Sequence, residues 1–439
     1  MRRLVAYGRK VYGLRELLAS VEDKRRRPPT PASRIANIVF FCGLLRVRSF
    51  NALEPKLKEL SFRRLVGAVA DQGEASLCSI DVVSRSLCAM PVSEAAKTAR
   101  AIMAKAERNK VFREGWIGGF RFAAIDGWEP FASYDRHCPQ CLARDVSFKQ
   151  TDGSVQVRTQ YYHRYVVAML IDKRLDLLLD FEPQLPADQR PDGKQDAHEG
   201  EQTAALRLLK RLKKTFHWLD VVVADALYAN GPFLTEVDRL KMSAIVVVKK
   251  ETDEPLKEAL SLWRDTAPEK IEVVDHLRAD GRPDGRERHE FRDCRDLETL
   301  DTYKGRIRVV RAQVTRVDGE GISLANTTTW CMLVTGIAAR RLSCRQILAA
   351  IRGRWHIENT GFHQWTTCWE FNHVFTHAGI DALFWLFFAA YNLLTLFLYI
   401  HIRTYGRDRG KDVTRTLSRF VDQLRDGLAC LAVSPWDTS

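Results

Sequence analysis

The stretch LDVVVADALYANG, residues 219–231, decides the fold because a buried strand ends there in an acid. A short apolar run of this kind is typical of a fully buried strand. Aspartate is a poor strand residue, and a turn explains Asp225 poorly because ALYANG delays the turn. FRFAAIDG, residues 120–127, repeats the pattern and predicts a strand that ends at Asp126. An Asp-Gly turn is by itself an adequate explanation for Asp126.

The segments around these two strands predict further regular elements. We expect strands over 161–171, 175–183 and 243–250, and helices over 200–218 and 232–242, the first of them with a basic face. The order strand, hairpin, helix, strand, helix, strand indicates a mixed α/β architecture.

The flanking regions have different textures. Residues 1–29 are basic and end in KRRRPP, which suggests a flexible arm or linker, and helical patterns follow it. Strand patterns return in 251–344, and helix returns in 343–365. The predicted domains are a helical, DNA-binding region or a plain helical bundle (1–115), the first part of an α/β core (116–250), a β-rich insertion (251–344), the second part of the core (345–402) and a helical tail (403–439).

The charge of the chain favours a polyanionic partner. The 439 residues include 68 Lys and Arg against 55 Asp and Glu, a net charge of +13. Nucleic acid is the usual partner of a long basic chain, although solubility alone also explains such a balance. The N-terminus has no uninterrupted apolar core, so it does not resemble a secretory signal and a cytoplasmic location is expected. Most of the ten cysteines should then be reduced.

One segment tests the expectation of a protein outside the membrane. Residues 382–400, ALFWLFFAAYNLLTLFLYI, have only Asn392 and Thr395 as clearly polar side chains. Their length and apolarity qualify them as a membrane span. A buried helix in a large core is the preferred interpretation.

The two strand-end acids predict a metal site. Acids at the carboxyl ends of neighbouring strands point into one crevice, and Glu358 on the helix of 343–365 would complete a cluster of three. Carboxylates that crowd together repel one another unless cations bind, and oxygen ligands suit Mg²⁺ or Mn²⁺. Arg354 lies one helical turn before Glu358. It can form a local ion pair with Glu358, or it can bind phosphate while Glu358 holds a metal.

RGRWHIEN, residues 352–359, resembles the last catalytic helix of bacterial insertion-sequence transposases of the DDE type, in the branch with the signature Tyr-x2-Arg-x3-Glu-x6-Lys. Asp126 and Asp225 are similar to the first and second family aspartates. Trp330 resembles the tryptophan that stabilises a flipped base. The positions of the family tyrosine and lysine, which contact DNA phosphate, hold Ile351 and Trp365 here. His356, His363 and Gln364 can supply replacement contacts.

The resemblance covers about residues 120–400 and implies a ribonuclease H-like mixed sheet flanked by helices, a β-rich insertion and cut-and-paste chemistry. It also implies Mg²⁺ or Mn²⁺ on Asp126, Asp225 and Glu358, terminal inverted repeats and target DNA as partners, and a homodimer on DNA. Two alternatives stay open: a DNA-binding protein on a transposase scaffold that no longer cuts, and a metal-dependent nuclease that does not join strands.

SYDRHCPQCLAR, residues 133–144, contains a separate candidate site, with His137 beside a Cys-x2-Cys pair of Cys138 and Cys141. Such a pair is half of a familiar zinc site, and His163 in the neighbouring strand is a sensible further ligand. Reduced buried cysteines explain the pair equally well, and a redox dithiol is less favoured. His373 and His377 have helical i, i+4 spacing and are interpreted as core or surface histidines, or as residues that line a DNA channel near Glu358.

Overall fold

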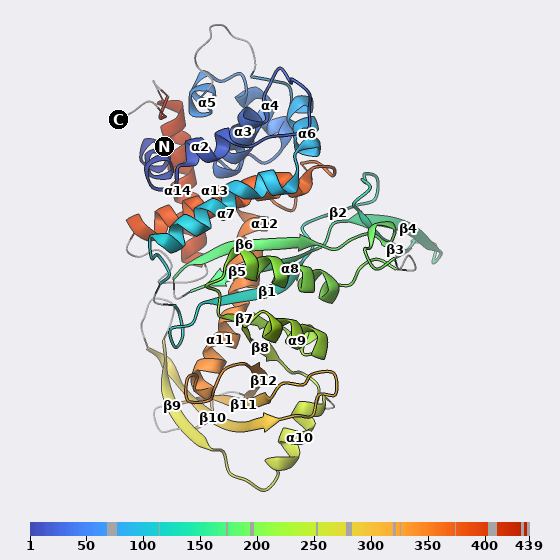
Figure 1. Ribbon diagram of the computed structural model, residues 1–439, viewed down its shortest axis with the longest axis vertical. Helices are drawn as coiled ribbons and strands as arrows, with labels where there is room; N and C mark the ends of the chain where they lie inside the picture. The colour runs from blue at the N-terminus through green and yellow to red at the C-terminus, as the bar shows by residue number, and fades with distance from the viewer. Residues whose placement is uncertain are drawn as a thin grey trace.

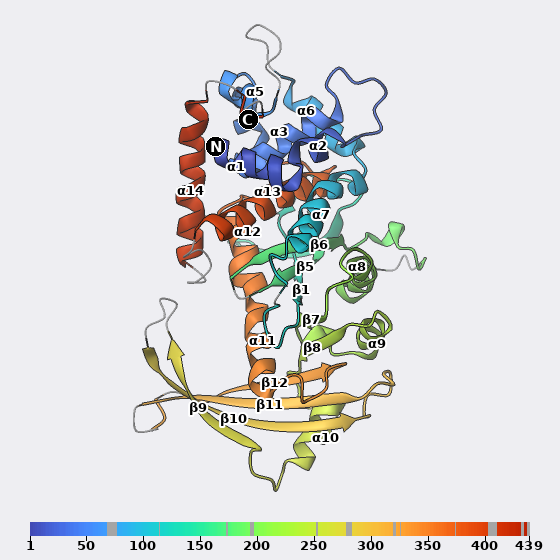
Figure 2. The ribbon, with the colours of Figure 1, turned by 60° about the vertical axis from the view of Figure 1, so that its left-hand side comes forward.

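The computed structural model describes residues 1–67, 77–113, 115–172, 174–193, 197–251, 253–277, 283–318, 322–324, 326–373, 375–402, 411–431 and 434–436. It has a large mixed sheet with helices on both faces, so the predicted mixed α/β class is confirmed (Figure 1). Figure 2 shows α11 (Cys344–His356) on one side of the sheet and α8 (Glu201–Thr215) and α9 (Gly231–Arg239) on the other.

The central sheet has nine strands in the order β6-β5-β1-β7-β8-β12-β11-β10-β9. β1, β7 and β8 are parallel to one another, and every other neighbouring pair is antiparallel. The strands are β1 (Phe122–Trp128), β5 (Tyr165–Ile171), β6 (Asp176–Pro183), β7 (Val221–Ala224), β8 (Ser243–Val247), β9 (Lys270–Leu277), β10 (Pro283–Leu297), β11 (Ile307–Val317) and β12 (Thr328–Thr335).

A second sheet, in the order β2-β4-β3, is built from the chain between β1 and β5. Its strands are β2 (Ala132–Ser133), β3 (Leu142–Lys149) and β4 (Val155–Tyr162). The continuous strand expected over 161–171 is therefore wrong: the chain leaves the small sheet after Tyr162 and enters the central sheet at Tyr165. The break falls at His163, whose ring lies against the two cysteines of the Cys-x2-Cys pair rather than along a strand.

The strands between residues 270 and 335 lengthen the central sheet. β12 pairs with β8, with Met332 opposite Val247, and β11, β10 and β9 follow outward. The predicted strand character of this region is confirmed, but its strands continue the same hydrogen-bonded sheet instead of forming a separate one. α10 (Glu254–Leu262) packs on β10 and β11.

The N-terminal region is helical, and the prediction of a flexible arm over residues 1–29 is wrong for its first two thirds. α1 (Arg2–Tyr7), η1 (Gly8–Tyr12) and α2 (Leu14–Ala19) bury Leu4, Val5, Leu14 and Leu18. These apolar side chains outweigh the basic ones in deciding the local structure because their burial is favourable. The helices that follow are α3 (Ala32–Leu44), α4 (Phe50–Lys56), α5 (Leu60–Leu65), α6 (Ile80–Ala89) and α7 (Val92–Arg108).

α13 (Ile380–His401) joins the helical region to the sheet, because it packs on α3, α7 and β6. Among the described residues it is the one helix long and apolar enough to cross a membrane, but 89% of its apolar window is buried inside the fold. The interpretation of residues 382–400 as a core helix is confirmed. Asn392 explains one polar interruption: its amide accepts from Leu178 N–H at 3.0 Å and donates to Leu178 C=O at 2.8 Å.

α14 (Lys411–Ala429) closes the helical region by packing against α5. Trp436, beyond α14, donates its indole N–H to Leu65 C=O and packs edge-on against Phe41. The N-terminal helices therefore share one core with the C-terminal elements, and the predicted limit at residue 115 stays a prediction.

The helix that carries Glu358 is interrupted. α11 (Cys344–His356) passes into a π-helical turn, η4 (Ile357–Phe362), and then into α12 (His363–Thr367). Seven residues make about two turns of an α-helix, which would place residue 365 on the face of Glu358. A π turn closes i→i+5 bonds and so rotates the following residues away from that face. Trp365 is consequently 0% exposed, among Trp128, Phe388 and Tyr391.

We predict that Trp365→Lys destabilises the fold, although lysine is the residue that the transposase signature has at this position. The ammonium would replace a fully buried indole, and the lost packing together with the buried charge should lower the free energy of unfolding by at least about 3 kcal/mol. Urea unfolding followed by circular dichroism measures this, with His363→Lys on the exposed side of α12 as the control. Equal stability of the Trp365 variant and wild type would contradict the core placement.

Candidate active site at the carboxyl edge of the sheet

Two of the predicted acids lie side by side on neighbouring strands. β1 and β7 are parallel, with Ala124 opposite Val223. The same offset, continued by two residues, puts Asp126 at the level of Asp225. Neighbouring strands lie about 4.8 Å apart, so the two acids stand together near the carboxyl edge of the sheet. The expected end of the first strand at Asp126 is wrong, because β1 continues to Trp128 and keeps pairing with β5.

α11 crosses the sheet and brings Glu358 to this edge. It packs on β1, β7 and β8 and begins with a capping box, in which Ser343 and Gln346 each accept from the other's backbone N–H. The glycine of Arg-Gly-Arg is required for close packing, because a Cβ on Gly353 would stand 1.9 Å from the Trp116 ring. On its outer side Arg352 pairs with Glu287 of β10 at 3.0 Å. The helix thus contacts the parallel strands β1, β7 and β8 and also β10.

Arg354 joins two of the three acids. Its Nη1 lies 2.6 Å from Asp126 Oδ2 and 2.9 Å from Glu358 Oε1. The Arg354 side chain is only 7% exposed, whereas that of Glu358 is 36% exposed. Both interpretations of Arg354 from the sequence therefore need refinement: the local pair with Glu358 exists, but the same nitrogen also binds Asp126 across the fold.

The electrostatics of this edge disfavour a second negative charge. The pKa of Asp126 is raised from its ordinary 3.8 to about 7, mainly by burial, with Glu358 adding to the rise and Arg354 opposing it. A cation that approaches the carboxylates would relieve this penalty. Carboxylate oxygens from two strands and a helix are a donor set that suits Mg²⁺ or Mn²⁺.

Asp225 is the least engaged of the three acids. Its Oδ1 accepts the N–H of Leu227 at 2.9 Å and so starts the short helix η3 (Ala226–Tyr228). The oxygens of Asp126, Asp225 and Glu358 do not all lie within 4.8 Å of one another; in the described part of the chain only one candidate metal group is that compact, and it contains none of them. The structure therefore brings Asp126 and Glu358 into contact through Arg354 and places Asp225 beside them by strand register.

Sequence reasoning missed a fourth acid at this edge. Glu201, at the start of α8 (Glu201–Thr215), accepts from the Tyr228 hydroxyl at 2.8 Å and pairs with Arg164 at 3.0 Å. A Cβ on Gly127 would stand 2.3 Å from Glu201 Oε2, so the glycine after Asp126 gives this carboxylate its room. A first-turn glutamate is common in any helix, and no local signal distinguishes this one.

The basic face expected on 200–218 is partly consumed inside the protein. Arg207 of α8 lies 2.8 Å from Glu182, and Arg211 of the same helix lies 2.8 Å from Asp180. Both acids belong to β6 and are buried. These guanidinium groups fasten α8 to the sheet, so they are not available as a free DNA-binding surface.

The predicted DNA-contacting residues are spread around the edge. Trp330 lies two residues before Met332 in β12; because β12 is antiparallel to β8, it stands at the same edge of the sheet as the acids. Its indole nitrogen is buried without a hydrogen-bond partner. His356 is half-buried beside Asp176 and the Trp116 ring, whereas His363 is exposed. Gln364 and Ile351 are buried.

The Cys-x2-Cys pair forms a compact cluster with His163 away from the acids. The ligand atoms of Cys138, Cys141 and His163 all lie within 4.8 Å of one another. The pKa of Cys138 is lowered to about 4, mainly by a hydrogen bond from the Cys141 thiol and also by His163. His137 is exposed and stacks on the Tyr161 ring, so it is not part of the cluster.

His373 and His377 do not lie on one helix, and that expectation is wrong: both are in the irregular segment between α12 and α13. Gly379 ends this segment with a positive φ of 75° before α13 begins. His377 is buried and its Nδ1 lies 3.5 Å from Cys141 Sγ, whereas His373 is exposed.

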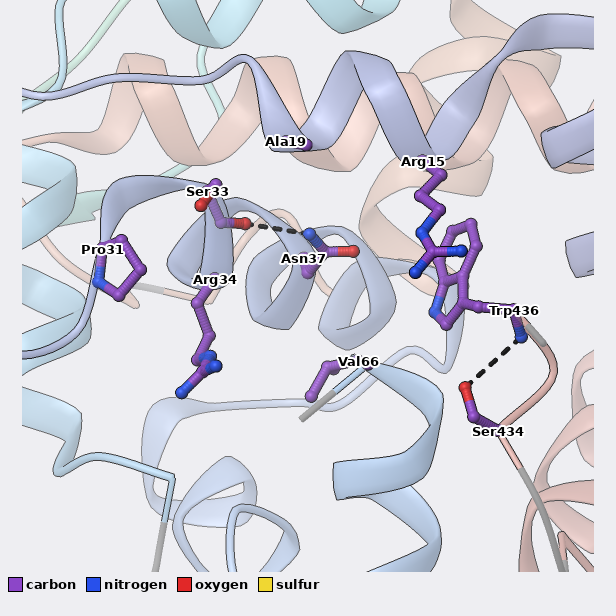
Figure 3. A pocket seen from close by; sticks show the side chains of 10 residues that line it. Arg15, Ala19, Pro31, Ser33, Arg34, Asn37, Val66, Ser434 and Trp436 are labelled. Atoms are coloured by element: carbon purple, nitrogen blue, oxygen red, sulfur yellow. Dashed lines mark hydrogen bonds between the residues drawn. The ribbon is translucent and has the colours of Figure 1, made fainter. Parts of the chain in front are cut away.

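A cavity of about 520 Å³ lies elsewhere, between α2, α3 and the C-terminal residues. Figure 3 shows Arg15 beside Trp436, Arg34 on α3, and Asn37 hydrogen-bonded to Ser33. None of the three acids lines it, so it is separate from the carboxyl edge of the sheet.

Comparison with known families identifies the region around the acids. The family model described as "Transposase DDE domain" matches residues 158–393, which is more than half of the chain. The match includes Asp225, Arg354 and Glu358, and it begins after Asp126. No curated protein matches this chain.

We predict that Asp126→Asn changes how stability depends on pH in the absence of divalent metal. The pKa of Asp126 is higher in the fold than its ordinary value, so its contribution to stability is complete below about pH 4 and is lost as the pH rises through 7. Between pH 5 and pH 8, the free energy of unfolding of wild type should therefore fall by on the order of 2 kcal/mol more than that of the variant. Urea unfolding at the two pH values measures the difference.

The exposed acid Asp135 gives the matched control, since Asp135→Asn should leave the wild-type pH dependence unchanged. Adding Mg²⁺ at pH 8 should stabilise wild type more than Asp126→Asn. The same loss of stability in wild type and Asp126→Asn would contradict a destabilised carboxylate at this edge.

Proposed function

The chain belongs to the transposase DDE domain family, and on this premise we propose that it cleaves the ends of a transposon and transfers the freed 3′ strands to target DNA. The chemistry would be two in-line displacements at phosphorus: hydrolysis at the transposon end, and then attack of the 3′ hydroxyl on target DNA. Asp126, Asp225 and Glu358 are the proposed catalytic acids.

One observation carries the proposal: Asp126 and Asp225 share a register level on two parallel strands, and Arg354 ties Asp126 to Glu358. Three separate segments of the sequence thereby deliver carboxylates to one edge. A structural role explains this poorly, because burial already penalises the charge on Asp126. A site that binds cations explains why a buried, charged Asp126 is kept, because a bound cation would offset the penalty of burying its charge.

The residues fit Mg²⁺ or Mn²⁺. All three donors are hard oxygens, and the partial exposure of Glu358 leaves an approach from solvent. Bound in a pair, such ions supply Lewis acidity for both the attacking and the leaving oxygen at phosphorus. We assign the holding role to Asp126, Asp225 and Glu358.

We assign Arg354 two successive partners. Without metal it neutralises Asp126 and Glu358, and its Nε has no hydrogen-bond partner. With Asp126 and Glu358 holding a metal, the Arg354 guanidinium would be free to bind a DNA phosphate in bidentate fashion. Its position one turn before Glu358 would then keep the phosphate next to the metal ligands.

We further propose that β1, β5, β6, β7 and β8 form a ribonuclease H-like core and that 251–344 is the family's insertion. The support is the position of that segment along the chain, after the strand of Asp225 and before the helix of Glu358. Its strands extend the sheet from β8 outward. Trp330 at the same edge is the proposed contact for an unstacked base. A homodimer on paired DNA ends is part of the proposal.

We predict that Glu358→Gln lowers strand cleavage and joining on the flanking terminal repeats with Mg²⁺ by at least about 100-fold, since loss of an outer-shell partner alone costs metal sites 10–100-fold. Glu370→Gln is the control, because Glu370 lies in the segment that follows α12 and pairs with Arg48 near the surface. The readout is the separation of labelled strands, with DNA binding measured in parallel.

The result discriminates between functions. Equal activity of wild type and Glu358→Gln would refute the proposed active site. Cleavage without joining in the wild type would identify a nuclease, and binding of the repeats without any cleavage would identify a non-catalytic DNA-binding protein.

A further inference from the structure

The cluster around Cys138 has the dimensions of a metal site. The two sulfurs are 3.7 Å apart, and His163 Nε2 lies 3.5 Å from Cys138 Sγ and 3.3 Å from Cys141 Sγ. Tetrahedral zinc with Zn–S of about 2.3 Å and Zn–N of about 2.0 Å separates two sulfurs by about 3.8 Å and a sulfur from a nitrogen by about 3.5 Å. The three ligand atoms therefore already surround a point where one zinc ion fits.

The candidate for the fourth ligand is His377, from a segment more than 200 residues further along the chain. Its Nδ1 is 3.5 Å from Cys141 Sγ. The residue is 8% exposed, and its Nε2 has no hydrogen-bond partner among the described residues. His377 is not part of the compact group of three, and movement of its imidazole toward the cluster would complete a tetrahedron.

The surroundings suit thiolate ligands. The Cys138 N–H donates to Cys141 Sγ at 3.3 Å, and the Cys141 N–H closes a turn on Cys138 C=O at 3.0 Å. Phe131 packs against the rings of both His163 and His377. Both cysteines are buried and free of disulfide bonds. The result is a buried cluster of two sulfurs and two imidazoles, the ligand set of a structural zinc site.

We propose that Cys138, Cys141, His163 and His377 form a structural zinc site that fastens the segment between α12 and α13 to the small sheet. Cys138 and Cys141 come from the loop between β2 and β3, His163 from the break between β4 and β5, and His377 from just before α13. The site is independent of the proposed catalytic acids and needs no assumption about DNA chemistry.

The position of the site gives it a mechanical role. Tyr165, two residues after His163, donates to Asp381 in the first turn of α13 at 2.8 Å. The metal would reinforce this contact and fix the segment that leaves α12, the helix that follows the π turn of Glu358. Loss of zinc should therefore loosen the segment downstream of Glu358 before it disturbs the central sheet.

The test is the zinc content of the full chain, purified without a metal-chelating tag and measured by mass spectrometry. We expect close to one zinc per chain in wild type. His377→Ala should weaken zinc at least tenfold in competition with a chromogenic chelator. Cobalt substitution should give the visible bands of a tetrahedral, thiolate-containing site. His373→Ala is the matched control, because His373 lies in the same segment but is exposed.

His377→Cys covers the case in which the alanine variant misfolds. Its thiolate should replace the imidazole as a ligand, so this variant should keep the metal and shift the cobalt bands to longer wavelength. Wild type that neither contains zinc nor takes it up on dialysis overturns the site. If His377→Ala holds zinc and cobalt as tightly as His373→Ala does, the four-ligand site is refuted. Zinc content and cobalt spectra do not depend on DNA cleavage, so failure here is distinguishable from failure of the proposed function.

Discussion

The bond of one guanidinium to two carboxylates is the interaction on which the arrangement of this protein depends. Arg354 reaches across 228 positions of sequence to Asp126 and also holds Glu358 one turn away. It therefore fixes α11 against β1 and compensates charges that burial disfavours. A hydrophobic contact could also hold the helix, but it would not keep two acids facing the same volume. The same ion pair therefore sets both the position of the helix and the charge balance at this edge of the sheet.

The core of the fold could be predicted because its strands carry unusually plain signals. Three valines before Asp225, and an apolar run before Asp126, leave little choice but buried strands. Parallel pairing of those strands then places Asp126 and Asp225 at one level. The resemblance of residues 352–359 to a known helix added Glu358 to the same edge. Local pattern and long-range position agree at these residues, so short stretches of sequence were sufficient.

The remaining features depend on contacts between distant segments. A π turn has no sequence signal of its own, so the rotation of Trp365 into the core appears only once the helix is packed. Glu201 looks like any helix-starting glutamate until Gly127 and Tyr228 surround it. His377 has helical spacing to His373 but lies in an irregular segment beside Cys141. The basic N-terminus forms helices because its few apolar side chains are buried in the core of the helical region.

The amide of Asn392 has a consequence for the whole sheet. It occupies the backbone N–H and C=O of Leu178 on β6, and α13 covers that strand. The outer edge of β6 is thereby occupied at Leu178, whereas β9 at the other end of the sheet pairs on one side only within the described residues. Exposed strand edges template further pairing. Within the described residues, an additional strand presented by a neighbouring molecule could extend the central sheet at β9, the end furthest from α13.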